Sequence, residues 1–500
     1  MMLMRPNLED LRIIGFYLGR ILLLVAGVIA LPLLWAVLGR EWGPASSFVL
    51  TAGAFALLGV SASARAPQGH HLDWSHGMVV AALAWLIVPA VGSLPLALSG
   101  HFANPLDAIF DAMSGLTTTG LSLLQDLDHL APSLNFWRHL LHFLGGQGIV
   151  LAAVSIFAGG AGLSMLYGEA REEKILPSVG STARFIWWAS VVHLLFGVLV
   201  LGSVAYFGLG FTPLRSAFHG LMVFFAGFDT GGFAPQSTSI GYYHSAVFEA
   251  ATAVFMVAGA MSFGLHYAIW RGPHRFRALR NLETRTLAST LLAALTLALV
   301  GLATLGLYRT VPALARQGLF HVLSAHTGTG LATVPSSELV RWGGLAFVGV
   351  TLAMALGGMA SSTAGGVKSL RVGLALKILK NHIKAVILPD RAVVSQAYYQ
   401  GGRKRVTPPL AQAVLVVTLL YVALYLAGAV AGLAYGYPLQ EALFESVSAS
   451  ANVGLSVGIT QPSMPVVLEI TYILQMWLGR LEFVAVFALI GFTVAAVRGR

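Results

Sequence analysis

The sequence predicts an all-α, polytopic membrane protein with four pseudo-symmetric repeats around a central axis, preceded by two extra N-terminal helices. Three observations predict this fold class. The chain has 500 residues, of which 57% are hydrophobic and 10% are charged, and its mean hydropathy is +0.78. Apolar runs of about the spanning length recur along the whole sequence, and one short pattern returns four times. No water-soluble globular core has this composition.

The apolar runs define the expected transmembrane helices. A span needs roughly 20 apolar residues because the hydrocarbon layer is about 30 Å thick. We expect ten spans, near residues 13–37, 46–63, 76–98, 136–160, 182–208, 244–270, 286–308, 343–383, 408–434 and 466–497. The first run is too long for a signal-peptide core and has no small-residue cleavage site, so we expect a retained helix. The sequence contains no cysteine, which excludes disulfides and thiolate chemistry.

Basic residues gather in alternate short loops between these runs. The clusters are Arg171, Lys174 and Arg184; Arg271, Arg275, Arg277, Arg280 and Arg285; Lys377, Lys380, Lys384 and Arg391; Arg403, Lys404 and Arg405; and Arg498 and Arg500. Cytoplasmic loops carry the excess of lysine and arginine, so an even number of spans places both termini in the cytoplasm. The net charge of +10 therefore reports membrane orientation, and we expect no nucleic-acid partner. Docking of membrane lipids or an acidic partner is a secondary role for these clusters.

A pattern of span, short segment, turn and span occurs four times. Each short segment is amphipathic, too brief to cross a membrane, and ends in a glycine-containing turn: Pro105 to Leu121, Pro213 to Phe233, Leu314 to Leu331, and Pro438 to Leu455. This is an internal repeat. In three repeats a phenylalanine precedes the aligned glycine by ten positions, namely Phe110, Phe320 and Phe444. Phe218 precedes its glycine by fourteen, so we expect a longer half-helix or loop in the second repeat.

The repeated turns favour a cation. Non-helical backbone at membrane depth must be buried in protein or line a watery cavity, so four such turns belong around a common axis. A half-helix that enters from outside points its partly negative C-terminal end inward. The turn beyond it can present backbone carbonyls in place of an ion's hydration shell, and glycine permits the tight reversal. The alternative is that these glycines only allow close helix packing.

Taken together, these residues resemble the Trk/Ktr/HKT superfamily of potassium transporters, specifically its TrkH-type membrane (pore) subunit. Besides the four turns, the resemblance rests on Asn135 to Arg138, Gly145 to Val150, Ala258 to His266, Gly357 to Lys368, and Leu478 to Glu482. It covers nearly the whole chain. It implies a division into a two-helix N-terminal part, 1–72, and four pore-loop repeats around a central pore, 73–170, 171–280, 281–392 and 393–500.

The resemblance implies a selectivity filter with one key glycine in each repeat. Its ion-binding positions, where K+ would meet backbone carbonyls, are Thr118, Thr119, Gly120, Thr230, Gly231, Gly232, Gly328, Thr329, Gly330, Asn452, Val453 and Gly454. In the family, serine at the first key position goes with sodium selectivity, so Gly120 favours potassium. The fourth turn lacks threonine, which leaves the strength of discrimination open.

The segment from Gly357 to Gly366 interrupts an apolar run with small and hydroxylated residues, and each glycine weakens a helix by roughly 1 kcal/mol. In the family this intramembrane loop lies under the filter and acts as a gate. The implied gate residues are Gly357, Gly358, Ser361, Ser362, Thr363, Gly365, Gly366, Lys368 and Arg480. The alternative is a kink that serves only packing.

Arg480 lies inside an apolar span, where a cationic side chain costs at least about 2.5 kcal/mol unless it faces a cavity or a partner. A positive charge beside a cation path raises a barrier to ions, and the family places an arginine beneath its filter. The alternative is a local pair with Glu482 or Glu445. Lys368 either contacts the gate loop or extends to the inner interface.

Three other polar residues have open roles. His266 is expected to be a buried, hydrogen-bonded histidine rather than a proton carrier. Asp111 and Asp229 either attract cations at the outer mouth or serve as cap or solvent-exposed residues.

The sequence favours potassium uptake by channel-like conduction across a bacterial cytoplasmic membrane. A symporter coupled to H+ or Na+ remains an alternative, with His266 and Asp229 as weak candidates for the coupling site. An intramembrane enzyme is disfavoured, because there is no His-Glu-x-x-His motif and there are no paired intramembrane carboxylates at useful spacing.

The sequence also lacks a Gly-x-Gly-x-x-Gly nucleotide fold, so we expect no cofactor in this chain, with K+ as the transported ion. The resemblance implies a homodimer that binds a cytoplasmic ring of nucleotide-binding regulatory subunits similar to TrkA.

Overall fold

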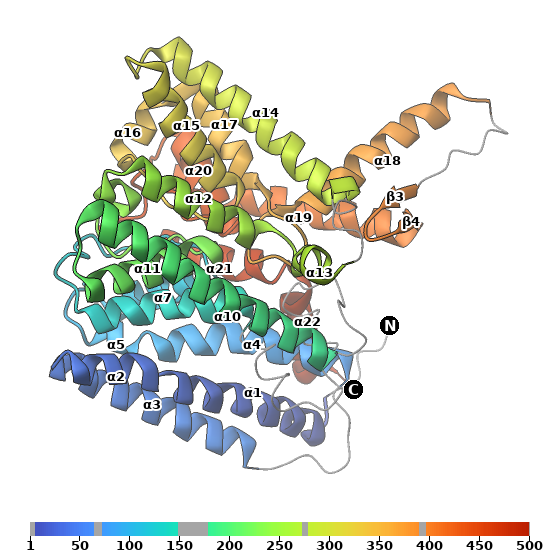
Figure 1. Cartoon of the computed structure of the whole chain (residues 1–500). Coiled ribbons are helices and arrows are strands. Elements are labelled where there is room, and N and C mark those ends of the chain that lie inside the picture. The colour runs from blue at the N-terminus through green and yellow to red at the C-terminus, as the bar shows by residue number, and fades with distance from the viewer. Residues whose placement is uncertain (1–5, 65–72, 149–178, 273–278, 390–396, 500) are drawn as a thin grey trace.

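The computed structural model describes residues 6–64, 73–148, 179–272, 279–389 and 397–499. Within these ranges the chain is almost entirely helical. The long helices run side by side, and the start of α1 lies at the same end of the bundle as the end of α22 (Figure 1). Strands pair in two places, β1 with β2 in parallel and β3 with β4 antiparallel. The predicted all-α fold class is confirmed.

Three helices form the N-terminal part: α1 (Leu8–Val28), α2 (Ala30–Leu38) and α3 (Trp42–Ser63). Helices α1 and α3 cross where two glycines face each other. An ideal Cβ on Gly19 or on Gly59 would come within 3.0 Å of the other glycine's carbonyl oxygen. Small residues at such crossings let transmembrane backbones approach closely.

Each repeat contains an outer helix, a short pore helix and an inner helix, in that order. Repeat 1 has α4 (Trp74–Gly92), α5 (Leu94–Ala97), α6 (Pro105–Leu116) and α7 (Pro132–Gln147). Repeat 2 has α10 (Val179–Ser203), η1 (Val204–Gly208), α11 (Pro213–Phe228), η2 (Ser239–Tyr243), α12 (Ala246–Ala260) and α13 (Phe263–Arg271). Repeat 3 has α14 (Leu282–Leu305), α15 (Val311–His326), α16 (Ser336–Arg341), α17 (Gly343–Ala355), β1 (Leu356–Gly357), β2 (Val367–Lys368) and α18 (Ser369–Ile387). Repeat 4 has β3 (Ala397–Tyr399), β4 (Arg403–Arg405), α19 (Pro408–Ala434), α20 (Leu439–Ser450), α21 (Val466–Arg480) and α22 (Val484–Arg498).

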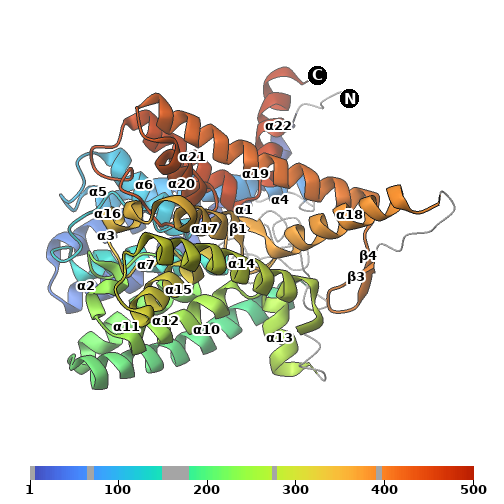
Figure 2. The same ribbon diagram turned by 90° about the horizontal axis from the view of Figure 1, so that it is seen from above.

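The pore helices are α6, α11, α15 and α20. Helix α11 has 16 residues, against 12 in α6 and in α20, but this greater length is not particular to repeat 2. Helix α15 also has 16 residues. Met222 lies ten positions before Gly232 and is fully buried, so it takes the place that phenylalanine has in the other repeats. In both views α11, α15 and α20 lie in the half of the bundle away from the end of α22 (Figure 2).

The described residues contain six helices long and apolar enough to cross a membrane, or up to eight if each bent pair is one span. The expected span at 343–383 is divided between α17 and α18 by the segment that the sequence marked as a break. The expected span at 136–160 begins as α7, and its part from residue 149 on lies outside the described residues.

The expected spans at 244–270 and 466–497 are each interrupted by a sharp bend. The chain bends by 101° between α12 and α13, and by 109° between α21 and α22. In the first bend, the Ser262 side chain accepts a hydrogen bond from Leu265 N and so starts a new helix. In the second, Glu482 and Phe483 adopt positive φ values of 49° and 71°, which end the helix. Hydropathy does not distinguish a bent span from a straight one.

The inner helices also approach the ends of the pore helices very closely. An ideal Cβ on Gly145, Gly259 or Gly479 would lie within 3.0 Å of the carbonyl oxygen of Leu116, Phe228 or Ser450, respectively. Each of these oxygens belongs to the residue four positions before the key glycine of its repeat. Glycine is therefore required where each of these three inner helices passes under its pore helix.

Candidate functional site

The four predicted turns meet in a closed ring. An ideal Cβ on each key glycine would come within 3.0 Å of a carbonyl oxygen of the next repeat. That oxygen belongs to the residue immediately before the next repeat's key glycine. The pairs are Gly120 with Gly231, Gly232 with Thr329, Gly330 with Val453, and Gly454 with Thr119. Repeats 1, 2, 3 and 4 therefore follow one another around an axis, and repeat 4 closes on repeat 1.

The backbone of the four turns has one geometry. The key glycines have φ of +89°, +81°, +80° and +94° in chain order. The residues two positions earlier are also left-handed: Thr118 (+54°), Thr230 (+51°), Gly328 (+72°) and Asn452 (+53°). The residue between them donates its N–H to a pore-helix carbonyl at 2.9 Å in every repeat: Thr119 to Ser114, Gly231 to Ala226, Thr329 to Ser324, and Val453 to Ser448. Non-glycine residues in this region are strained and persist only where the surroundings fix them.

Side chains of the turns bond to other protein groups. Thr117 and Thr119 join their hydroxyls at 2.8 Å, and Thr327 and Thr329 do the same in repeat 3. The amide of Asn452 donates to Thr119 Oγ1 at 3.0 Å and to a carbonyl of α21 at 2.9 Å, which links repeats 4 and 1. The turns thus differ in sequence but keep the same backbone path.

A polar side chain nine positions before the key glycine holds the loop after the turn in three repeats. Asp111 accepts from Ser122, His321 accepts from Thr333 N, and Glu445 accepts from Ser456, Val457 N and Thr460. Repeat 2 has Val223 at this position. Our sequence reasoning missed this function, although the equal nine-residue spacing is visible in the sequence.

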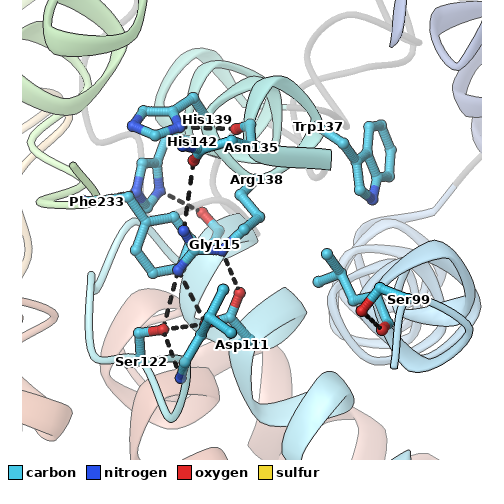
Figure 3. A network of polar contacts seen from close by, with 12 residues as sticks. Ser99, Asp111, Gly115, Ser122, Asn135, Trp137, Arg138, His139, His142 and Phe233 are labelled. Atoms are coloured by element: carbon cyan, nitrogen blue, oxygen red, sulfur yellow. Dashed lines mark hydrogen bonds and ion pairs between the residues drawn. The ribbon is translucent and has the colours of Figure 1, made fainter. Parts of the chain in front are cut away.

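Neither aspartate lies at an exposed outer mouth, so that interpretation is wrong. Asp111 is fully buried and pairs with Arg138 of α7, with Nε to Oδ2 at 2.6 Å (Figure 3). Asp229 is also fully buried at the end of α11, where it accepts a hydrogen bond from Gln147 at 2.5 Å. A hydrophobic run around each residue gave no sign of these partners.

The break segment, Gly357 to Gly366, is entirely buried. Its ends pair as β1 and β2, with Leu356 opposite Val367. One side is anchored to repeat 2: Met359 N donates to Ala260 O at 2.9 Å, and Thr363 Oγ1 lies 2.9 Å from Gly259 O.

The break segment also touches two of the turns. Thr363 Oγ1 is 3.0 Å from Phe228 O and accepts from Thr230 Oγ1 at 3.2 Å. On the other side, an ideal Cβ on Gly365 would come within 3.0 Å of Ala451 O in the fourth turn. Ser361 adopts φ +55°, and Ser362 Oγ donates to Met359 O at 2.6 Å within the segment. The segment therefore contacts the turns of repeats 2 and 4 directly.

Arg480 joins three parts of this region. Its Nη1 donates to Thr118 Oγ1 at 2.9 Å and to Thr363 O at 2.5 Å, and its Nη2 donates to Gly145 O at 2.7 Å. The guanidinium thus bridges the first turn, the break segment and the inner helix of repeat 1. Of the two carboxylates weighed as local partners, Glu445 holds the loop after the fourth turn and Glu482 pairs with other cations.

A buried ion cluster lies next to Arg480. Glu482 pairs with Arg371, and it lies 3.9 Å from Lys368 Nζ. Lys368 also donates to Ala364 O of the break segment, so the predicted contact with that loop is present and the side chain is 5% exposed. These residues connect the start of α18 to the bend between α21 and α22.

His266 is buried, as expected, and its Nε2 lies 2.9 Å from Ala258 O. It belongs to α13, and its contacts are with the end of α12 and with aromatic rings such as those of Phe228 and Trp270.

Comparison with known proteins identifies the family. A sequence model of the TrkH family, described as cation transport protein, matches residues 46–492. The chain belongs to the TrkH family. As a TrkH-family member it is a multi-pass membrane transport protein and not an enzyme.

Several TrkH-family relatives are similar over most of their length. An uncharacterized cation transporter of Methanocaldococcus jannaschii is 30% identical over 85% of this chain and 84% of its own. The Trk system potassium uptake protein TrkH of Halomonas elongata is 30% identical over 81% of this chain and 82% of its own. The crystal structure of the potassium transporter TrkH from Vibrio parahaemolyticus superposes with a TM-score of 0.80 at 25% identity, covering 96% of this chain and 98% of that one.

Proposed function

We propose that this TrkH-family chain takes up potassium through the ring of four turns by channel-like conduction. The observation that carries the proposal is the closed succession in which each key glycine abuts the carbonyl of the next repeat. Four carbonyls at one level, from Thr119, Gly231, Thr329 and Val453, are the hard oxygen ligands that can replace the hydration shell of an alkali cation.

The pore helices add a favourable field. All four end immediately before a turn, and the C-terminal end of a helix carries a partial negative charge of about half an elementary charge. Four such ends converge on the ring, so a cation in it is stabilised. Potassium is the ion named for the relatives from Halomonas elongata and Vibrio parahaemolyticus.

The break segment and Arg480 form the gate in this proposal. The segment contacts the turns of repeats 2 and 4, and Arg480 bonds both to the first turn and to the segment. A cation leaving the ring inward meets a buried obstruction and a fixed positive charge. Movement of the segment, of α18 or of the α21–α22 bend opens the path.

Replacing Thr363 with valine tests the gate. The change keeps the side-chain shape but removes the hydroxyl that contacts Phe228 O, Gly259 O and Thr230. Losing such buried hydrogen bonds destabilises the closed state by about 1–3 kcal/mol. We therefore expect the population of the open state to increase and potassium flux into proteoliposomes to rise several-fold. Ser362→Ala is the control, because that hydroxyl bonds only within the segment to Met359 O among the described residues. Equal flux in both variants contradicts the gating role.

The assembly is part of the proposal. We propose a homodimer bound to a cytoplasmic ring of nucleotide-binding subunits. The name of the Halomonas elongata relative, a Trk system protein, supports an assembly of several components. We place the chain in the bacterial cytoplasmic membrane with both termini inside. We also retain the division at 1–72, 73–170, 171–280, 281–392 and 393–500.

Ion flux into proteoliposomes of the purified chain tests the function. We expect uptake of potassium and rubidium to exceed that of sodium and lithium by at least about tenfold, which corresponds to ~1.4 kcal/mol of discrimination. A symporter differs in one readout, because at zero membrane potential an imposed proton or sodium gradient drives its potassium uptake against a potassium gradient. A channel shows no such uptake. No cation flux, even with the regulatory subunit added, contradicts the proposal.

A further inference from the structure

Two side chains of the inner helix α7 contact the turns of two different repeats. Arg138 and His142 are four positions apart, so they lie on one face of α7. Figure 3 shows both pointing toward the same region, where the pore helix of repeat 1 meets Phe233 of repeat 2. Phe233 directly follows the key glycine Gly232.

His142 bridges the two repeats with its two ring nitrogens. Nδ1 lies 2.7 Å from Gly115 O, in the last turn of pore helix α6. Nε2 accepts a hydrogen bond from Phe233 N at 3.2 Å. Because Nε2 is the acceptor, Nδ1 carries the proton and donates to Gly115 O. The ring is fully buried, and both of its polar atoms are used.

Arg138 makes a second bridge one turn away. Its guanidinium pairs with Asp111 in the pore helix of repeat 1. It also donates a hydrogen bond to Ser122 Oγ, at 2.9 Å, in the loop that follows the first turn. The same guanidinium lies 4.0 Å from the centre of the Phe233 ring. Two adjacent side chains therefore hold Phe233 by its backbone and by its ring.

The His142 ring also lies directly behind the second turn. The three atoms nearest to an ideal Cβ on Gly231 are all ring atoms of His142, each within 3.0 Å. Gly231 supplies the carbonyl that faces Gly120 across the junction of repeats 1 and 2. His142 thus limits how far this carbonyl can move away from the first turn.

Other junctions of the ring are built differently. Repeats 4 and 1 are linked by Asn452 within the turn and by Arg480 at the end of α21. Repeats 2 and 3 are linked by loop residues, with Gly241 N donating to Ala332 O at 3.2 Å. At the junction of repeats 1 and 2, two side chains of the inner helix α7, Arg138 and His142, make the link.

We propose that His142, supported by Arg138, is a positioning residue that sets the spacing between the first and second turns and so contributes to potassium over sodium discrimination. The inference rests on the proposed function of the ring. A wider junction offers carbonyls that no longer match potassium, whereas the smaller, more strongly hydrated sodium ion gains relative access.

The test compares sodium and potassium flux into proteoliposomes for the full chain and His142→Ala. We expect the potassium to sodium flux ratio to fall by about tenfold, a loss equivalent to ~1.4 kcal/mol, while potassium still passes. Phe143→Ala is the matched control, because it removes a larger buried ring from the next position of α7, where it packs on Trp187 and Phe225. The control should keep the parent ratio.

An unchanged ratio in folded His142→Ala overturns the inference. If that variant does not fold, His142→Gln makes the same comparison, since its amide keeps a hydrogen-bond donor and an acceptor but lacks the rigid ring that lies against Gly231. If the parent chain does not select potassium, the proposed function fails instead, so the two failures are distinguishable.

A double substitution gives an independent readout. Gly231→Ala should strongly reduce potassium flux, because its Cβ collides with the His142 ring. Adding His142→Ala removes all three colliding atoms, so flux in the double variant should exceed that of Gly231→Ala several-fold. Such non-additivity is the mark of residues in contact. A double variant no better than Gly231→Ala contradicts the positioning role.

Discussion

Replacing Gly330 with alanine is expected to abolish potassium flux. Gly330 has φ +80°, and an ideal Cβ there would come within 3.0 Å of the backbone of Val453 and Gly454. The left-handed conformation alone costs a side chain roughly 1–2 kcal/mol. The contact with Val453 O adds to this, because a backbone carbonyl in a closed ring cannot move aside without disturbing its neighbours. The measurement is rubidium uptake into proteoliposomes at equal amounts of folded protein.

Gly306→Ala is the control for backbone strain. Gly306 has φ +63°, but an ideal Cβ there meets no atom within 4 Å among the described residues. We expect this variant to lose some stability and to keep nearly all of its flux. If both variants conduct like the parent chain, the third turn does not line the ion path.

Replacing Arg480 with alanine is expected to produce the largest gain of flux. At an effective dielectric constant of about 20, two unit charges about 8 Å apart repel by roughly 2 kcal/mol. Removing this charge from beneath the turns therefore raises the conduction rate by up to about 30-fold. The change also removes the hydrogen bonds to Thr118, Thr363 and Gly145, which hold the break segment against the first turn.

Arg480→Lys separates charge from hydrogen bonding. Lysine keeps the positive charge but not the planar fork that reaches three acceptors. We expect its flux to lie between those of the parent and Arg480→Ala, measured as the initial rate of potassium uptake without the regulatory subunit. A rate in Arg480→Ala at or below that of the parent contradicts a blocking role for this side chain.

Much of the architecture follows from local sequence signals. The order of span, half-helix, turn and span was predictable from two signals. The length of an apolar run indicates whether a segment crosses the membrane, and a glycine that recurs after each short run indicates where the chain reverses. The equivalence of Met222 with Phe110 was not predictable, because another apolar residue fills the same buried position. The bends after Ala260 and Arg480 were missed because hydropathy measures composition and not direction.

The polar partners were the harder part of the site. Asp111 and Arg138 lie 27 positions apart in chain segments that both look apolar, so nothing local indicates that they pair. His142 likewise meets Phe233 only after repeats 1 and 2 have come together. By contrast, the glycines at 145, 259 and 479 recur at equivalent places in three repeats. Aligning the repeats with one another would have revealed their close approach to the pore helices.

Anomalous scattering from rubidium tests the central claim most directly. Crystals of the chain grown in rubidium should show an anomalous peak on the axis of the ring, at the level of the carbonyls of Thr119, Gly231, Thr329 and Val453. Exchange of rubidium for sodium should abolish the peak. Rubidium bound only away from this ring, in crystals where the four turns keep their arrangement, would contradict the account.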